Sequence, residues 1–299
     1  MDSVLLLSAW LLATPTPVET RFERLAPGPV AAMDGAESPR RSPGIGRAVV
    51  LLHGLRLQPV SEEAVRRAEP CYWEKPEAPV VKALSAEADV YAFHYAQSIP
   101  LDDVARTPDL YRAIRSLCEA GYPEVVLVGY SAGGVIARQF VEDQPHGGGV
   151  TKVVQVCAPN GGSEWTVLSH GVRSAQVPFI RSLTKESRSA ANNLRGEKRV
   201  PDEVEFVCLV AVCTWKGDGI VRRDCQWTPD LQKQGIRAET IFVQHIGAMY
   251  SSRLASKVAE LVRTPQPRWT SEQVAAAKPE ILGWLASSKR KAQPVLSDE

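Results

Sequence analysis

Residues 125–141 read VVLVGYSAGGVIARQFV, and this stretch decides the fold. The run of branched apolar residues at 125–128 is typical of a strand that is buried on both faces of a parallel sheet. The segment 135–141 has the pattern of a helix. Between the two lies Gly-Tyr-Ser-Ala-Gly, which holds Ser131 in a tight turn. The stretch therefore predicts a strand, a turn and a helix, with a serine hydroxyl at the turn.

The glycines at 129 and 133 are expected to make this turn possible, because side chains there would clash with the neighbouring strand and helix. We expect Ser131 to be held in a strained conformation, with its hydroxyl exposed at the sheet edge. The nearby helix N-terminus would favour negative charge that develops on a reacting group. A Gly-rich turn with a solvated serine is the alternative, but the flanking strand and helix favour a nucleophile.

Further apolar runs indicate that this strand belongs to a larger sheet. They alternate with amphipathic stretches such as 110–118, in which apolar residues recur at helical spacing. Strands that alternate with helices predict an α/β fold class, with a mostly parallel sheet flanked by helices. In such sheets ligands bind beyond the carboxyl ends of the strands, so we expect functional residues just after each run. The runs are 48–52, 89–95, 153–157, 206–212 and 240–243.

A serine hydroxyl needs a base to remove its proton, so the chain should carry a histidine and an acid at later strand ends. Asp218 lies in Trp-Lys-Gly-Asp-Gly-Ile-Val, just after the run 206–212. His245 follows the run 240–243 by two residues. We expect His245 to take the Ser131 proton as general base and to return it to the leaving group. Asp218 then orients the imidazole and stabilises its charged form.

Simpler interpretations of the acid and the base stay open. An aspartate between two glycines is often only a turn residue, and a histidine after a strand can be a surface group. If Asp218 is not the acid, Asp224 and Asp230 are its substitutes. Other histidines are weaker candidates for the base, because they come before the expected position of the acid or inside a strand. They are His94, His146 and His170.

The oxyanion of a tetrahedral intermediate needs two convergent backbone N–H donors. One donor should be Ala132, the residue after the nucleophile. The other should come from the loop after the first core strand, which makes Leu55 the expected second donor. In the same loop, His53 is expected to be a structural hydrogen-bonding residue and not a catalytic base.

Composition and charge are those of an ordinary packed protein. Hydrophobic residues make up 44% and charged residues 23% of the 299, and this length fits one large α/β domain. The formal net charge of +1 gives no field that would concentrate a polyanion, so we expect no nucleic-acid partner. The six cysteines form no C-x-x-C pair, and the sequence indicates neither a metal site nor a cofactor. Cys213 and Cys225 flank Asp218 and are either two thiols or, in an oxidising compartment, a disulfide.

The chain divides by composition into a leader, a linker, a domain and a tail. Residues 1–13 form an apolar leader that is compatible with a signal peptide of a secreted or periplasmic protein, although no Lys or Arg precedes the apolar run. An N-terminal helix docked on the domain of a cytoplasmic protein is the alternative. Residues 14–46 are rich in Pro, Gly and Ser and predict a flexible linker. The domain spans 47–287, and 288–299 form a polar tail.

At these motifs the chain resembles the bacterial triacylglycerol lipases and the inositol-deacylase-like esterases of the α/β-hydrolase superfamily. Tyr130 and Ala132 stand where such lipases usually have His and Met, and Asn160 replaces a usual His. We expect these departures to change the lining of the site and to leave the catalytic roles intact. The matching pieces follow the order of the family and are Leu52-His53-Gly54-Leu55, the segment 129–135, Cys157-Ala158-Pro159-Asn160-Gly161-Gly162-Ser163 and Gly217-Asp218-Gly219-Ile220-Val221.

The resemblance implies the α/β-hydrolase fold with a cap or lid insertion, which we name the cap segment, at about residues 164–200. A plain helical connection packed on the sheet is the alternative there. It also implies hydrolysis of carboxylic esters, as by a lipase or carboxylesterase, through an acyl-enzyme. Acyltransferase, thioesterase and amidase chemistry would use the same residues, and a non-catalytic member that binds an acyl ligand or a protein is a further alternative. The expected partner is a small acyl ester or lipid, with transient contact to a membrane or lipid surface at most, and protein partners are left open.

Overall fold

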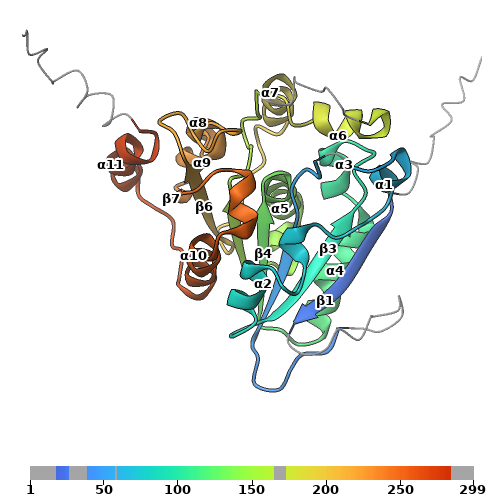
Figure 1. Ribbon diagram of the computed structural model, residues 1–299. Coiled ribbons are helices and arrows are strands. Elements are labelled where there is room, and N and C mark those ends of the chain that lie inside the picture. Colours follow the sequence, from blue (N-terminus) through green and yellow to red (C-terminus); the bar gives the residue numbers. More distant parts are fainter. Residues whose placement is uncertain (1–17, 27–38, 58, 165–172, 284–299) are drawn as a thin grey trace, which may run out of the picture.

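The centre of the computed structural model is a seven-stranded sheet, drawn as arrows in Figure 1. The structure describes residues 18–26, 39–57, 59–164 and 173–283. The strands lie in the order β1-β3-β2-β4-β5-β6-β7, in which β1 pairs antiparallel with β3 and all other neighbours pair in parallel. They are β1 (Thr20–Ala26), β2 (Arg47–Leu52), β3 (Asp89–Tyr95), β4 (Glu124–Tyr130), β5 (Lys152–Val156), β6 (Glu205–Val212) and β7 (Arg237–Phe242).

Strands β2 to β7 were predicted from apolar runs, and each run lies in or overlaps its strand. The runs are apolar throughout because the side chains of a central strand enter cores on both faces of the sheet. In β4, Val125 and Leu127 are buried in one core, whereas Val126 and Val128 are buried in the other. The predicted α/β fold class, with a mostly parallel sheet flanked by helices, is therefore confirmed.

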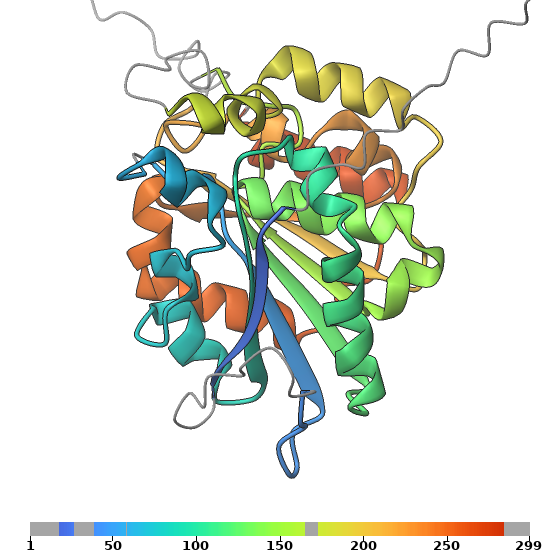
Figure 2. The ribbon, with the colours of Figure 1, turned by 90° about the vertical axis from the view of Figure 1, so that its right-hand side faces the viewer.

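Helices cover both faces of the sheet, as Figures 1 and 2 show. One core is closed by α3 (Leu101–Ala105), α4 (Pro108–Glu119), α5 (Ala132–Asp143), α9 (Pro229–Lys233) and α11 (Ser271–Ile281). The other core is closed by α2 (Pro79–Leu84) and α10 (Ser252–Arg263). Shorter elements connect these layers: α1 (Glu62–Arg66), α8 (Arg223–Gln226), η1 (Tyr72–Glu74), η2 (Pro145–Gly149) and η5 (Ile246–Tyr250).

The linker predicted over 14–46 is wrong in one part, because Thr20–Ala26 form the edge strand β1. The stretch was missed because its charged residues hide the strand pattern. Those charges find partners on β3, where Glu23 pairs with His94 and Arg24 pairs with Asp89. An edge strand needs fewer apolar residues than a central one, and charges on it also discourage pairing with other chains.

The described part of the cap segment contains short helices. They are η4 (Ser174–Gln176), α6 (Val177–Arg181) and α7 (Lys185–Leu194). Arg188 of α7 is fully buried, and its guanidinium Nη2 lies 2.6 and 2.7 Å from the two carboxylate oxygens of Asp102 on α3. This ion pair anchors the cap segment on the domain.

Some predicted features lie outside the described residues. They are the apolar leader at 1–13, the polar tail at 288–299, and His170, which falls in 165–172. Within the ranges that are described, no helix has both the length and the apolar character that a membrane span requires.

Candidate active site

The predicted serine, acid and base lie at the same edge of the sheet. Ser131 follows β4 directly, Asp218 follows β6, and His245 follows β7. Because these strands are parallel, their carboxyl ends meet at one edge, where α/β sheets bind their ligands. Three positions that are far apart in the sequence are thereby brought together.

These three side chains form one hydrogen-bonded chain. His245 Nε2 lies 2.9 Å from Ser131 Oγ, and His245 Nδ1 lies 2.7 Å from Asp218 Oδ2. All three residues are buried. The carboxylate accepts from Nδ1–H, which leaves Nε2 free to accept the serine proton. The arrangement can raise the nucleophilicity of a serine hydroxyl.

Ser131 has the strained backbone that the tight turn predicts, with φ 53° and ψ −122°. A Cβ at position 129 would lie 2.5 Å from the helix backbone at Gly134, and one at position 133 would lie 2.2 Å from the Leu52 carbonyl oxygen of β2. The two glycines are therefore required for close packing, as predicted. Ser131 N–H donates to the Val156 carbonyl at 2.8 Å, which ties the turn to β5.

Asp218 is held in place by backbone and side-chain donors. Its Oδ1 accepts from the N–H groups of Ile220 at 2.9 Å and Val221 at 2.7 Å. The Gln226 amide nitrogen lies 3.4 Å from Oδ2, and the His245 N–H donates to the Asp218 backbone carbonyl at 3.0 Å. The acid and the base are therefore fixed relative to one another through backbone as well as side-chain contacts.

The Tyr130 side chain contacts the backbone of His245. Its hydroxyl donates to the backbone carbonyl of His245 at 2.8 Å, and its ring packs against Trp73 with centroids 5.2 Å apart. Its ring also lies beside the His245 ring, with centroids 5.5 Å apart. The residue acts on the position of His245, which only the three-dimensional fold reveals.

Asn160 belongs to a buried hydrogen-bond network. It is buried, and its side-chain amide donates to Gln155 Oε1 at 2.9 Å and to the Gln226 carbonyl at 2.8 Å. Gln155 in turn donates to the Gly134 carbonyl of α5 at 2.7 Å. This network ties the loop after β5 to the helix behind the nucleophile.

The two predicted oxyanion donors belong to segments next to Ser131. Ala132 begins α5, immediately after Ser131. The loop of residues 53–56, which we name the oxyanion loop, approaches so closely that a Cβ on Gly54 would lie 2.8 Å from the Ser131 Cβ. Throughout the described ranges, the N–H groups of Leu55 and Ala132 donate to no acceptor of the protein. Both are therefore available to a ligand.

The alternative acids and bases have other partners. Asp224 pairs with Arg222, and Asp230 pairs with Arg138. His146 is exposed and pairs with Glu203, while His94 is buried between Glu23 and Glu74. None of these side chains contacts Ser131 or His245 in the described structure.

His53 has the structural role that was expected. Its ring stacks on Tyr95 with centroids 4.0 Å apart, and its Nδ1 lies 2.8 Å from the Gly54 carbonyl oxygen. Complete burial lowers the pKa of His53, so the ring is neutral and Nδ1–H can donate to that carbonyl.

One group of side chains in the described residues could hold a metal ion, and it overlaps the same site. Atoms of Cys157, Asp218 and His245 lie within 4.8 Å of one another. Both ring nitrogens of His245 are already hydrogen-bonded, so an ion there would displace Ser131 or Asp218 as a partner. Burial also raises the pKa of the Cys157 thiol well above its usual range, which keeps the sulfur protonated.

All six cysteines are free thiols. Cys213 Sγ faces Gly219, whereas Cys225 lies against Gly161. Of the two alternatives for this pair, the structure has the two separate thiols and not the disulfide.

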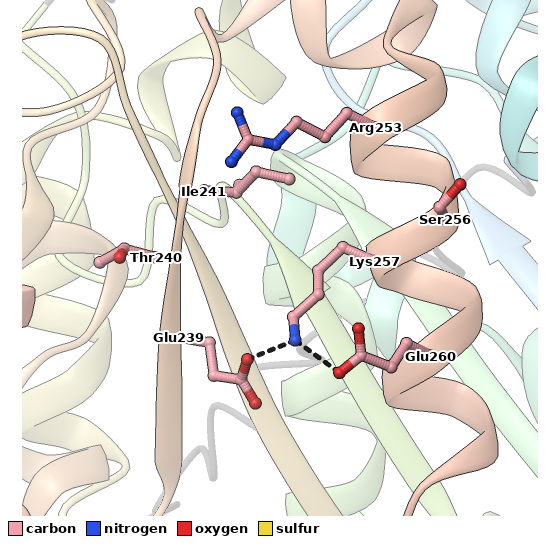
Figure 3. Close-up of a pocket in the computed structure, with 7 residues that line it drawn as sticks. All are labelled: Glu239, Thr240, Ile241, Arg253, Ser256, Lys257 and Glu260. Carbon is pink, nitrogen blue, oxygen red and sulfur yellow. Dashed lines mark hydrogen bonds and ion pairs between the residues drawn. The ribbon is translucent and has the colours of Figure 1, made fainter.

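A groove lies between β7 and α10 (Figure 3). Lys257 spans it, with its ammonium 2.7 Å from carboxylate oxygens of both Glu239 and Glu260. Arg253 also lines the groove, so its two cations balance its two carboxylates, and Ser131, Asp218 and His245 are not among the lining residues.

Comparison with known proteins finds one matching family and several structures of similar fold. A family model described as "Alpha/beta hydrolase family" matches residues 49–290. The mature form of Bacillus licheniformis lipase BlEst2 is similar in structure, with a TM-score of 0.55 at 15% identity, over 83% of this chain and 99% of that chain. Phospholipase PlaB from Legionella pneumophila, in complex with thio-NAD, has a TM-score of 0.58 at 12% identity, over 84% of this chain and 66% of that chain. No curated protein sequence matches the chain.

Proposed function

The chain belongs to the alpha/beta hydrolase family, and from this premise we propose that it is a serine hydrolase that cleaves carboxylic esters through Ser131, His245 and Asp218. The observation that carries the proposal is the hydrogen-bonded chain of these residues, with 2.9 Å from serine to histidine and 2.7 Å from histidine to aspartate. Their sequence order of Ser, Asp and His is also that of α/β-hydrolase triads.

In the proposed mechanism, His245 Nε2 takes the Ser131 hydroxyl proton as Oγ attacks the ester carbonyl carbon. The carbonyl oxygen becomes an oxyanion, which accepts hydrogen bonds from the N–H groups of Leu55 and Ala132. When the intermediate collapses, His245 returns the proton to the leaving alkoxide and an acyl-enzyme remains. Water then attacks the acyl-enzyme by the same steps, which releases the acid and restores Ser131. Asp218 stabilises the imidazolium in both halves.

Support for ester substrates comes from the motifs and from the printed names of the structural neighbours, a lipase and a phospholipase. We therefore propose small acyl esters or lipids as the substrate class, with the inositol-deacylase-like resemblance as a further pointer to lipid esters. Amide, thioester and acyl-transfer chemistry would run through the same residues, and turnover of the corresponding substrates distinguishes them.

The test is labelling with a fluorophosphonate probe, together with hydrolysis of p-nitrophenyl esters with short and long acyl chains. We expect the wild type to label and to turn over, and Ser131→Ala to do neither. Ser85→Ala is the matched control, because Ser85 is only half-buried and its hydroxyl donates to the Lys82 carbonyl in its own turn of chain. If the well-folded wild type neither labels nor hydrolyses any ester, with or without detergent, the proposal is wrong and a binding role takes its place.

A further inference from the structure

Gln97 lies two residues after β3 and is completely buried beside the oxyanion loop. Its side-chain nitrogen donates to the Gly54 carbonyl at 2.9 Å. Its side-chain oxygen accepts from the Arg56 N–H at 3.0 Å. The donor and the acceptor fix which way the amide points, since a flipped amide would lose both bonds. One side chain therefore holds both peptide groups that flank Leu55.

The bond to Gly54 sets the direction of the Leu55 N–H. The Gly54 carbonyl and the Leu55 N–H belong to one peptide group, and in a trans peptide they point in opposite directions. Since Gln97 and His53 both hold the carbonyl on one side, the N–H is turned to the other side. That N–H is the second donor that the proposed mechanism needs, and rotation of this one peptide would remove it.

The end of β3 anchors the preceding peptide as well. The Tyr95 hydroxyl donates to the His53 carbonyl, and the Gln97 N–H donates to the Val65 carbonyl at 2.9 Å. Consecutive carbonyls of the oxyanion loop, at 53 and 54, are thus each held by a side chain from the end of β3. The loop is not free to turn without breaking buried hydrogen bonds.

The same amide is connected to the cap segment. Gln176 of η4 is buried, and its side-chain nitrogen lies 2.9 Å from both Gln97 Oε1 and the Arg56 carbonyl. A second contact with the cap segment lies nearby: the carboxylate of Glu62 on α1 accepts hydrogen bonds from the N–H groups of Ser174 and Ala175 at 2.8 Å each. The cap segment, through Gln176, therefore donates a hydrogen bond to the Gln97 side chain, which in turn holds the oxyanion loop.

We propose that Gln97 is a positioning residue that orients the Leu55 N–H as oxyanion donor, and that Gln176 couples this orientation to docking of the cap segment. The inference rests on the proposed function. It names residues that the catalytic motifs do not contain, and it makes the competence of the oxyanion hole depend on a contact between the domain and its insertion.

The first test compares Gln97→Leu and Gln97→Glu by kcat and KM for a p-nitrophenyl ester. A glutamate keeps the acceptor for Arg56 and Gln176 but cannot donate to the Gly54 carbonyl. We expect both variants to lose about 100-fold in kcat, the size of a lost oxyanion donor, with KM changed less than about threefold. If the role of Gln97 is only to tie the loops together, Gln97→Glu keeps its activity.

The second test uses Gln176→Leu, which leaves the bond from Gln97 to Gly54 intact. We expect a smaller loss in kcat, about tenfold, because the coupling is weakened and the donor is not removed. Gln266→Leu is the matched control. Gln266 is also buried, and its side chain donates to the Thr264 carbonyl at 3.1 Å. It lies near Glu205, at the amino end of β6, whereas Ser131, Asp218 and His245 follow the carboxyl ends of their strands. Thermal unfolding of every variant shows whether the fold is kept.

Inhibition by a trifluoromethyl ketone distinguishes a misplaced oxyanion donor from a general loss of packing. Ser131 Oγ adds to its carbonyl carbon, His245 takes the proton, and the resulting oxyanion needs the same donors as the transition state. We expect its inhibition constant to rise across the variants in proportion to the loss in kcat/KM. The pH profile of kcat/KM should stay unchanged, because His245 is not touched.

The outcomes separate the inference from the proposed function. If the wild type labels and turns over but Gln97→Leu and Gln97→Glu stay within about twofold of Gln266→Leu in kcat, the inference is overturned and the proposed function stands. If Gln97→Leu fails to fold, Gln97→Glu and Gln176→Leu decide the question by the same criterion. If the folded wild type neither labels nor turns over, both are wrong.

Discussion

Gly54 determines how closely the oxyanion loop approaches the nucleophile. A Cβ at this position would lie 2.8 Å from the Ser131 Cβ and 3.0 Å from the Tyr130 ring. Neither neighbour can yield, since Ser131 is in the strained turn and Tyr130 is buried against Trp73. We therefore expect Gly54→Ala to lower kcat/KM at least about 100-fold by moving the Leu55 donor, measured on a p-nitrophenyl ester.

The matched control for Gly54→Ala is Gly46→Ala, where the nearest atom to the new Cβ is Pro123 Cγ at an ordinary 3.6 Å. This variant should keep wild-type kinetics. Full activity in folded Gly54→Ala would contradict the close approach of the loop and would leave Leu55 without its assigned position.

Tyr130, in the tight turn next to Ser131, helps to position His245. Tyr130→Phe removes the hydroxyl that donates to the His245 carbonyl at 2.8 Å and leaves that carbonyl without its buried donor. We expect a loss of about 1–3 kcal/mol in the free energy of unfolding and about tenfold in kcat, because the imidazole is held less well. Urea unfolding and steady-state kinetics measure the two effects. Tyr111→Phe, on the exposed side of α4, should change neither, and an unchanged kcat in Tyr130→Phe would show that the contacts with Asp218 hold His245 without the tyrosine hydroxyl.

At this scale the sequence predicts which residues come together at the strand ends but not which residues hold them. Ser131, Asp218 and His245 could be predicted because each follows a strand closely and parallel strands end at one edge. Gln97 also follows a strand, but a glutamine carries no chemical signal of its own. Its role depends on the direction of one peptide group, which no local pattern encodes.

Among the elements, the antiparallel pair of β1 and β3 carries a buried ionic contact that responds to pH. His94 of β3 lies 2.7 Å from Glu23 of β1 and 2.8 Å from Glu74 of η1. Burial alone would lower the pKa of His94, but the two carboxylates raise it to about 9. A folded-state pKa above that of the unfolded chain stabilises the fold below about pH 6.5, and this stabilisation is lost as the pH rises through about 9.

We therefore expect the wild type to lose stability relative to His94→Gln between about pH 6 and about pH 10, by at most about 3 kcal/mol. Urea unfolding of both proteins at the two pH values gives the difference. His146→Gln is the control, since His146 is exposed. A difference between wild type and His94→Gln that does not change with pH would mean that His94 is neutral in the folded protein.

The same strand shows why sequence patterns find central elements more easily than edge elements. The runs behind β2 to β7 are apolar because both of their faces are buried. In β1, by contrast, Arg21, Glu23 and Arg24 interrupt the apolar pattern, and the β3 partners of Glu23 and Arg24 lie far away in the sequence. Composition alone therefore describes this stretch as a linker.

The whole molecule consists of two cores that share one sheet. Side chains from the same strands enter both cores, so neither core can lose its packing without disturbing the strands of the other. Two cysteines can serve as probes of the two cores, because Cys208 is buried in one core and Cys157 in the other. Burial raises the pKa of both thiols well above the usual range, so neither reacts while it is covered.

Pulsed labelling with a thiol reagent at increasing urea, read out by mass spectrometry, tests whether the two cores unfold together. Cys118 is exposed and should be labelled without urea. Cys157 and Cys208 should become labelled over one common urea range, because the sheet between them unfolds as a unit. Different midpoints for the two thiols would show instead that one layer of helices can separate while the sheet remains. In full denaturant without reductant, all six thiols should react, Cys213 and Cys225 among them, since the structure joins no pair of them.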